Sequence, residues 1–135
     1  MSYAGDVSPR EAWEALRDDP DAVLVDVRTH AEWTYVGLPV LDEVDKVVVP
    51  IEWVRYPDGA PNPGFLDSLR EILEDGQPVY FLCRSGVRSV AAAEAATAAG
   101  LGPAYNVLDG FEGQHDVEGH RSHGGWKNSG LPWRQ

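Results

Sequence analysis

The chain has 135 residues, 43% of them hydrophobic and 24% charged, which suits one globular domain spanning residues 1–135 with a core of its own. Eleven Lys and Arg against 22 Asp and Glu give a formal net charge of −11, so nucleic acid and membrane surfaces are poor candidates for partners. We find neither a membrane-spanning run nor a signal peptide and expect a cytoplasmic protein. The single cysteine, Cys83, excludes an internal disulfide.

Helices and strands are expected to alternate along the chain. Capping boxes at Ser8 and Thr29 mark two helix starts, and a run with seven alanines marks another helix. Helices are expected over residues 9–18, 30–37, 65–75 and 90–99. Apolar and β-branched runs predict strands over residues 22–27, 46–50, 78–82 and 104–108. This order predicts a three-layer α/β domain with a mostly parallel central sheet.

The last segment, residues 114–135, is rich in Gly, His and Trp and has no regular period. We expect an irregular tail that packs on the core through Trp126, Leu131 and Trp133. Five residues of this segment raise the alternative of a metal site: His115, His120, His123, Asp116 and Glu118. Their spacing fits no closed zinc pattern and no cysteine lies near them, so we favour a polar surface loop.

Cys83 follows the expected strand at 78–82 and precedes the Ala-rich helix. Ligands of parallel sheets bind beyond the carboxyl ends of the strands, and a helix start with Arg84 and Arg88 nearby favours an anion. We therefore expect a Cys83 thiolate that is open to solvent, with the N–H groups of residues 85–89 turned toward the sulfur. Gly86 suits the unusual backbone angle of such a loop. The alternative, a buried structural cysteine, does not account for its polar neighbours.

Three segments resemble the rhodanese family of sulfurtransferases. They are residues 23–28 (VLVDVR), residues 83–89 (CRSGVRS), and residues 107–111 (VLDGF) with Trp126 and residues 130–132. The resemblance covers about residues 5–132 and implies a rhodanese-like fold with Cys83 as the nucleophile. It also implies a loop that binds the substrate, made of Arg84, Ser85, Gly86, Val87, Arg88 and Ser89.

The resemblance implies a sulfur transfer in two steps. Cys83 attacks the outer sulfur of a small anionic donor such as thiosulfate, expels sulfite and becomes a persulfide. The persulfide then gives its outer sulfur to a thiophilic acceptor, which is cyanide, a thiol or a protein. Arg84 and Arg88 are expected to orient the donor. No metal or organic cofactor is required.

Asp26 and Arg28 are expected beside the loop, at the end of the adjacent strand. The resemblance implies that they help to hold the active-site region together, and an ordinary ion pair is the alternative. Glu32 lies four residues after Arg28, a spacing at which the two side chains can pair. After Gly37 the chain departs from the family, because it lacks the usual His-Ile at that point.

Two alternative functions stay open. The first is phosphate or arsenate handling, as a phosphatase or an arsenate reductase. Phosphatases of related folds place five residues between cysteine and arginine, whereas four residues separate Cys83 from Arg88, so this loop suits one sulfur atom better than a phosphoryl group. A persulfide carrier or sensor that acts on a protein partner is not separated by sequence from an enzyme with turnover. The acidic composition and the two arginines also predict a positively charged mouth on a negative background.

Overall fold

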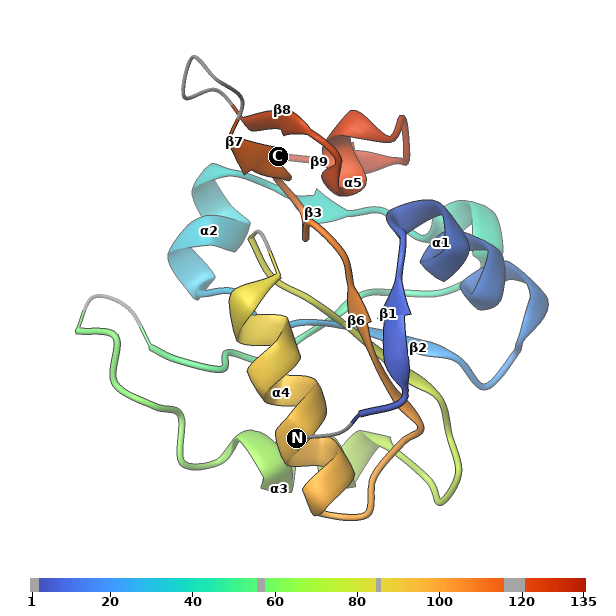
Figure 1. Cartoon of the computed structure of the whole chain (residues 1–135), viewed down its shortest axis with the longest axis vertical. Coiled ribbons are helices and arrows are strands. Elements are labelled where there is room, and N and C mark those ends of the chain that lie inside the picture. Colours follow the sequence, from blue (N-terminus) through green and yellow to red (C-terminus); the bar gives the residue numbers. More distant parts are fainter. Residues whose placement is uncertain (1–2, 56–57, 85, 116–120) are drawn as a thin grey trace.

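The computed structural model describes residues 3–55, 58–84, 86–115 and 121–135. A five-stranded sheet lies at its centre in the order β1-β6-β5-β2-β4, and every neighbouring pair of these strands is parallel (Figure 1). The strands are β1 (Gly5–Val7), β2 (Val23–Asp26), β4 (Val49–Pro50), β5 (Val79–Leu82) and β6 (Ala104–Val107). The predicted α/β fold with a mostly parallel sheet is therefore confirmed.

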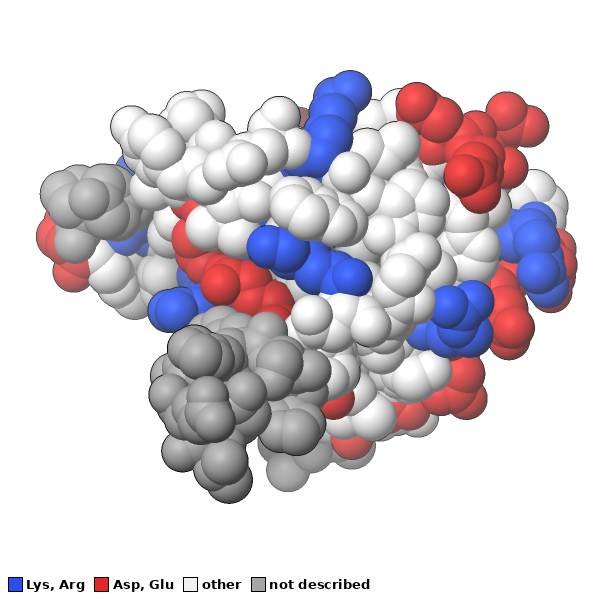
Figure 2. All heavy atoms as spheres, turned by 90° about the horizontal axis from the view of Figure 1, so that it is seen from above, with Lys and Arg blue, Asp and Glu red and all other residues white. Residues whose placement is uncertain are grey.

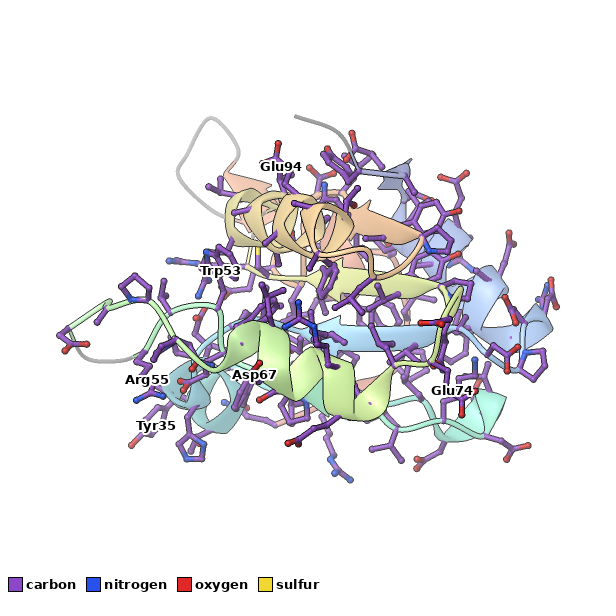
Figure 3. The ribbon with its side chains drawn as sticks, turned by 90° about the horizontal axis from the view of Figure 1, so that it is seen from below. Tyr35, Trp53, Arg55, Asp67, Glu74 and Glu94 are labelled. Carbon is purple, nitrogen blue, oxygen red and sulfur yellow. The ribbon has the colours of Figure 1, made fainter. Side chains whose placement is uncertain are left out.

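Helices cover both faces of the sheet, because the central strands are apolar on both sides. The helices are α1 (Pro9–Asp18), α2 (His30–Tyr35), α3 (Phe65–Ile72), α4 (Val87–Ala98) and α5 (Gly125–Asn128), with a short 3₁₀ turn at Asp42–Val44. Val25 and Phe81 pack in one core with α3 and α4, while Leu24 and Tyr80 pack in the other with α1 and α5. Figure 3 shows Glu94 on the outer side of α4, away from the sheet.

The two capping boxes are present as predicted. Ser8 Oγ accepts a hydrogen bond from the Glu11 amide at 3.0 Å, and the Glu11 carboxylate accepts one from the Ser8 amide at 2.8 Å. Thr29 and Glu32 make the equivalent pair of contacts at the start of α2. These local hydrogen bonds satisfy amides that a helix start leaves unpaired, which is why the sequence signal is reliable.

Other boundaries differ from the predictions. The helix expected from residue 90 begins at Val87, so only four residues separate β5 from α4. The strand expected over 46–50 is reduced to β4. The first strand, β1, was not predicted, and it forms because its three residues pair in register with β6. A two-stranded sheet of β3 (Leu38–Pro39) and β9 (Trp133–Arg134) was also not predicted.

The C-terminal segment is more regular than expected. It contains β7 (Gln114–His115), β8 (Arg121–His123), α5 and β9, so the description of an irregular tail is wrong. Trp126 and Leu131 are buried on the core as predicted, and the Trp126 indole donates a hydrogen bond to the Pro132 carbonyl at 2.7 Å. Trp133 is 40% exposed.

Two findings concern only the described residues. Three members of the metal-site alternative, Asp116, Glu118 and His120, lie outside them, and within them no group of three His, Cys, Asp or Glu side chains is placed to hold a metal ion. No helix in the described part of the chain has the length and apolar character needed to cross a membrane.

Candidate active site

The sheet brings the predicted site residues to its carboxyl edge. Leu82 of β5 is in register with Asp26 of β2, and the Val27 amide donates to the Leu82 carbonyl at 2.8 Å. Cys83 and Arg28 therefore leave neighbouring parallel strands at the same edge. This is the position at which sheets of this class bind ligands.

The sulfur of Cys83 lies at the start of α4. It accepts a hydrogen bond from the Gly86 amide at 3.1 Å and lies 3.2 Å from Ser89 Oγ. Gly86 is the N-cap of α4 and has φ +115°, a left-handed conformation that suits glycine. The expected turn of a loop amide toward the sulfur is thus confirmed at Gly86, whereas Ser85 lies outside the described residues.

The expectation of a sulfur open to solvent is wrong. Cys83 is 1% exposed and belongs to the buried cluster that also holds Phe81 and Ala92. The reason is the short connection between β5 and α4, which keeps the side chain under the first turn of the helix. Amide and hydroxyl groups reach the buried sulfur, so its surroundings are polar on one side and apolar on the other.

A tight turn after β6 supports the backbone of Cys83. The amides of Phe111 and Glu112 donate to the carbonyls of Cys83 and Arg84 at 2.7 and 3.0 Å. Gly110 has φ +59°, and a Cβ there would collide with the Cys83 carbonyl and with Arg84 backbone atoms. The sequence contains this glycine within the resemblance to the family, but its contact with the Cys83 loop could not be read from spacing.

Asp26 and Arg28 form a fully buried ion pair. Arg28 Nε and Nη2 donate to the Asp26 carboxylate at 2.9 and 2.7 Å, and Nη2 also donates to the Gly37 carbonyl at 2.6 Å. The Arg28 guanidinium lies 4.2 Å from the centre of the Phe111 ring. The pair thus contacts the turn that holds the Cys83 carbonyl, which joins it to the site through packing.

Glu32 forms an ion pair with Arg88. The spacing of four residues had suggested Arg28 as its partner. Arg88 Nη1 and Nη2 donate to the two Glu32 carboxylate oxygens at 2.7 and 2.9 Å. Burial alone would raise the pKa of Glu32, but the hydrogen bonds from Arg88 and the Thr29 amide outweigh it and lower that pKa. Burial alone would lower the pKa of Arg88, but Glu32, with smaller effects of the charges of Cys83 and Asp26, raises it.

Arg84 and Val87 are the exposed residues in the described part of the predicted loop. The Arg84 side chain is 49% exposed, and its Nε lies 3.5 Å from Glu112 Oε2. Val87 is 79% exposed at the start of α4. Figure 2 shows basic and acidic side chains together on the face at the top of Figure 1, where β7, β8 and α5 lie above the ends of β1 and β6. A positively charged mouth stays a prediction.

Asn106 is a site residue that the sequence did not single out. It is 2% exposed on β6, and its Oδ1 accepts a hydrogen bond from Ser89 Oγ at 2.6 Å. A lone polar residue inside an otherwise apolar strand was the available signal, since buried polar groups need a partner.

The chain is similar to several known proteins. The chain is 58% identical to Rv0390 from M. tuberculosis, whose crystal structure superposes with a TM-score of 0.92 and 99% coverage of both chains. It is 39% identical over 126 residues, 92% of each chain, to the uncharacterized protein RC0915 of Rickettsia conorii. It is 31% identical over 128 residues to the chloroplastic rhodanese-like domain-containing protein 4 of Arabidopsis thaliana, covering 93% of this chain and 25% of that protein.

The fold is that of a rhodanese-like domain, with Cys83 at the carboxyl edge of its parallel sheet. Residues 4–135 match the family described as the STR4 middle domain, and the chain belongs to that family. The match covers β1 through β9 and thus includes every site residue described above. The fold is also similar to that of the polysulfide-sulfur transferase homodimer from Wolinella succinogenes, which is 22% identical, with a TM-score of 0.63 and coverage of 96% of this chain and 77% of that chain.

Replacement of Gly110 tests the support of the Cys83 backbone. We expect Gly110→Ala to be clearly less stable than Gly76→Ala in urea unfolding. Both glycines have a left-handed backbone, which costs a side chain about 1 to 2 kcal/mol, but a Cβ at Gly76 meets no atom within 4 Å. Equal losses of unfolding free energy in the two variants would show that the collision with the Cys83 carbonyl adds nothing to the cost of the left-handed backbone.

The lowered pKa of Glu32 predicts a pH-dependent contribution to stability. The contribution is present above the ordinary carboxyl pKa of about 4 and is lost as the pH falls through the lower, folded-state value. Glu32→Gln is therefore expected to lose about 1 to 3 kcal/mol of unfolding free energy at neutral pH and much less at low pH.

Urea unfolding across a series of pH values measures this difference. Arg88→Met serves as the control background, because it removes the main partner of Glu32 and with it most of the effect of Glu32→Gln. A loss of stability that is equally large at acidic and neutral pH would contradict the prediction.

Proposed function

We propose that the protein is a sulfurtransferase that moves a sulfane sulfur from an anionic donor such as thiosulfate to a thiophilic acceptor through a persulfide on Cys83. The observation that carries this proposal is the hydrogen bond of 3.1 Å from the Gly86 amide to Cys83 Sγ, at the start of a twelve-residue helix. An amide and the positive end of a helix stabilise a negative charge on sulfur in both the thiolate and the persulfide.

The proposed reaction balances in two displacement steps. In the first, the Cys83 thiolate attacks the outer sulfur of thiosulfate, a new S–S bond forms, and the bond to the sulfonate sulfur breaks with its electron pair leaving on sulfite. In the second, cyanide or another thiophile attacks the outer sulfur of the persulfide. The S–S electron pair returns to Cys83, and thiocyanate or the sulfurated acceptor leaves.

Arg84 is the better placed of the two loop arginines to receive the donor. The two terminal nitrogens of Arg88 are engaged by Glu32, whereas Arg84 is half exposed and has one carboxylate at the longer distance of 3.5 Å. A guanidinium near the sulfur attracts a dianion and offsets the charge that develops on departing sulfite. Arg88 then contributes to the charge around Cys83 without binding the donor directly.

Burial of Cys83 favours a second candidate, a persulfide carrier that releases its sulfur only to one protein partner. A 1% exposed sulfur reacts after the loop opens, and a partner that binds the loop can promote that opening. Since Cys83 is the single cysteine, no second thiol of the chain can discharge the persulfide. Multiple turnover with thiosulfate and cyanide favours the enzyme, and loading without turnover favours the carrier.

Mass spectrometry of the loaded protein tests the proposal directly. After incubation with thiosulfate and removal of excess donor, we expect the peptide that contains Cys83 to gain the mass of one sulfur atom. Addition of cyanide should remove that mass and release thiocyanate. Cys83→Ser provides the matched control, and the absence of the gain in the wild-type protein rejects the sulfurtransferase proposal.

Replacement of Arg84 tests the proposed contact with the donor. We expect Arg84→Ala to lower kcat/KM for thiosulfate by about tenfold, because it removes a charged partner of the dianion. Arg17→Ala is the control, because the Arg17 side chain is similarly exposed, at 54%, and also pairs with a carboxylate, that of Asp18. Both residues lie at the C-terminal end of α1. Similar kcat/KM values for Arg84→Ala and Arg17→Ala would remove Arg84 from the proposed role.

A further inference from the structure

Hydrogen bonds connect the sulfur of Cys83 to the surface through α4, β6 and β1. Cys83 Sγ lies 3.2 Å from Ser89 Oγ, which lies 2.6 Å from Asn106 Oδ1. Asn106 Nδ2 donates to Asp6 Oδ1 at 3.0 Å, and the Tyr3 hydroxyl donates to the same oxygen at 2.7 Å. Ser89 and Asn106 are buried, whereas Asp6 is exposed. The network therefore runs from a buried sulfur to an exposed carboxylate.

The carboxylate of Asp6 determines the direction of these hydrogen bonds. An ionised carboxylate only accepts, so the Asn106 amide must present its NH₂ group to Asp6 and its oxygen to Ser89. That amide oxygen carries no hydrogen, and Ser89 must therefore be the donor in the bond between them. A serine hydroxyl has one hydrogen, so the side of Ser89 Oγ that faces Cys83 is a lone pair.

This direction distinguishes two states of the sulfur. A protonated Cys83 can donate its S–H to the lone pair of Ser89 Oγ. An anionic sulfur at 3.2 Å faces that lone pair instead, and it gains a hydrogen bond from Ser89 only if the hydroxyl turns away from Asn106. The turn leaves the buried Asn106 oxygen without a donor, which is unfavourable. The Gly86 amide donates to the sulfur in either case.

We propose that Asn106 is a positioning residue that holds the Ser89 hydroxyl as an acceptor toward Cys83 and so favours the protonated cysteine in the resting protein. Formation of an anionic sulfur then requires the hydroxyl hydrogen to move from Asn106 to Cys83. Asp6 acts one step further away by fixing the orientation of the Asn106 amide. The effect of Asn106 on sulfur transfer rests on the proposed function, whereas its effect on the protonation of Cys83 rests only on the hydrogen bonds described above.

Other charges also act on the sulfur from the elements that meet there. They are Arg88 of α4 with its partner Glu32 of α2, the buried pair of Asp26 at the end of β2 and Arg28, and Arg84 with its partner Glu112. These charges stay unchanged when Asn106 is replaced. Replacement of Asp6 does remove a charge, and this direct effect persists in a protein that lacks the Ser89 hydroxyl.

The test is a pH titration of the thiolate by its ultraviolet absorbance, which requires no reagent to reach the buried sulfur. Because the chain has one cysteine, the difference from the same protein carrying Cys83→Ala belongs to Cys83 alone. We expect Asn106→Leu to move the midpoint of this titration to lower pH by about one pH unit, the size of one ordinary hydrogen bond. In a Ser89→Ala background, Asn106→Leu should leave the midpoint unchanged.

The comparison of backgrounds separates positioning from a structural role. Loosening of the core by Asn106→Leu would move the midpoint equally with and without Ser89, and that result overturns the proposal. A midpoint that stays or rises in Asn106→Leu overturns it as well. Thr97→Val is the control for loss of a hydroxyl, since Thr97 lies on α4 and bonds the Ala93 carbonyl at 2.8 Å. It should not move the midpoint.

Asp6→Ala keeps the proposal testable if Asn106→Leu does not fold, because Asp6 is exposed. We expect a larger shift to lower pH with Ser89 than in the Ser89→Ala background, and equal shifts overturn the proposal. The titration uses no sulfur donor, so its outcome is independent of the mass gain with thiosulfate. A protein that gains no sulfur but shows the Ser89-dependent shift loses the sulfurtransferase proposal and keeps the role of Asn106.

Discussion

The site depends on the contact between the turn after β6 and the backbone of Cys83 and Arg84. A strand that ends at the edge of a sheet leaves carbonyl groups that need donors, and the Phe111 and Glu112 amides supply them. The approach is so close that only glycine fits at position 110. On its other side the turn is held by α5, since the Trp126 amide donates to the Gly110 carbonyl at 2.8 Å. The C-terminal segment therefore fixes where Cys83 lies, although none of its described residues contributes a group to the sulfur.

The three arginines of the site differ in how they are paired with carboxylates. Arg28 is buried against Asp26 and packs on Phe111, which connects β2 to the same turn. Arg88 is held by Glu32, so α2 and α4 are joined across the edge of the sheet. Arg84 retains an exposed guanidinium. An acidic protein can in this way keep one cation available beside its cysteine while the other two stabilise the surrounding structure.

Local signals in the sequence predicted much of the fold, and the failures have a common cause. The capping boxes, the central strands β2, β5 and β6, and the glycine of the Cys83 loop were predicted from residues close together in the chain, and each was confirmed. The pairing of Glu32 with Arg88 joins residues 56 positions apart, which no spacing rule could anticipate. The same is true of Asn106, whose partners Ser89 and Asp6 lie on other elements. Burial of Cys83 was missed because the exposure of a residue in a short loop depends on where the neighbouring strand and helix lie in space. The residue types in the loop do not give that placement.

The depth of Cys83 has a kinetic meaning. Because Cys83 is 1% exposed, a reagent reaches its sulfur only when the surrounding structure opens, and the frequency of that opening limits the rate of the reaction. Peroxide, which oxidises a thiolate to a sulfenic acid and, on further oxidation, to irreversible products, is subject to the same limit as the proposed sulfur donor. The burial that protects Cys83 from oxidation therefore also slows its reactions. A change that raises the frequency of opening exposes the cysteine to oxidation more often.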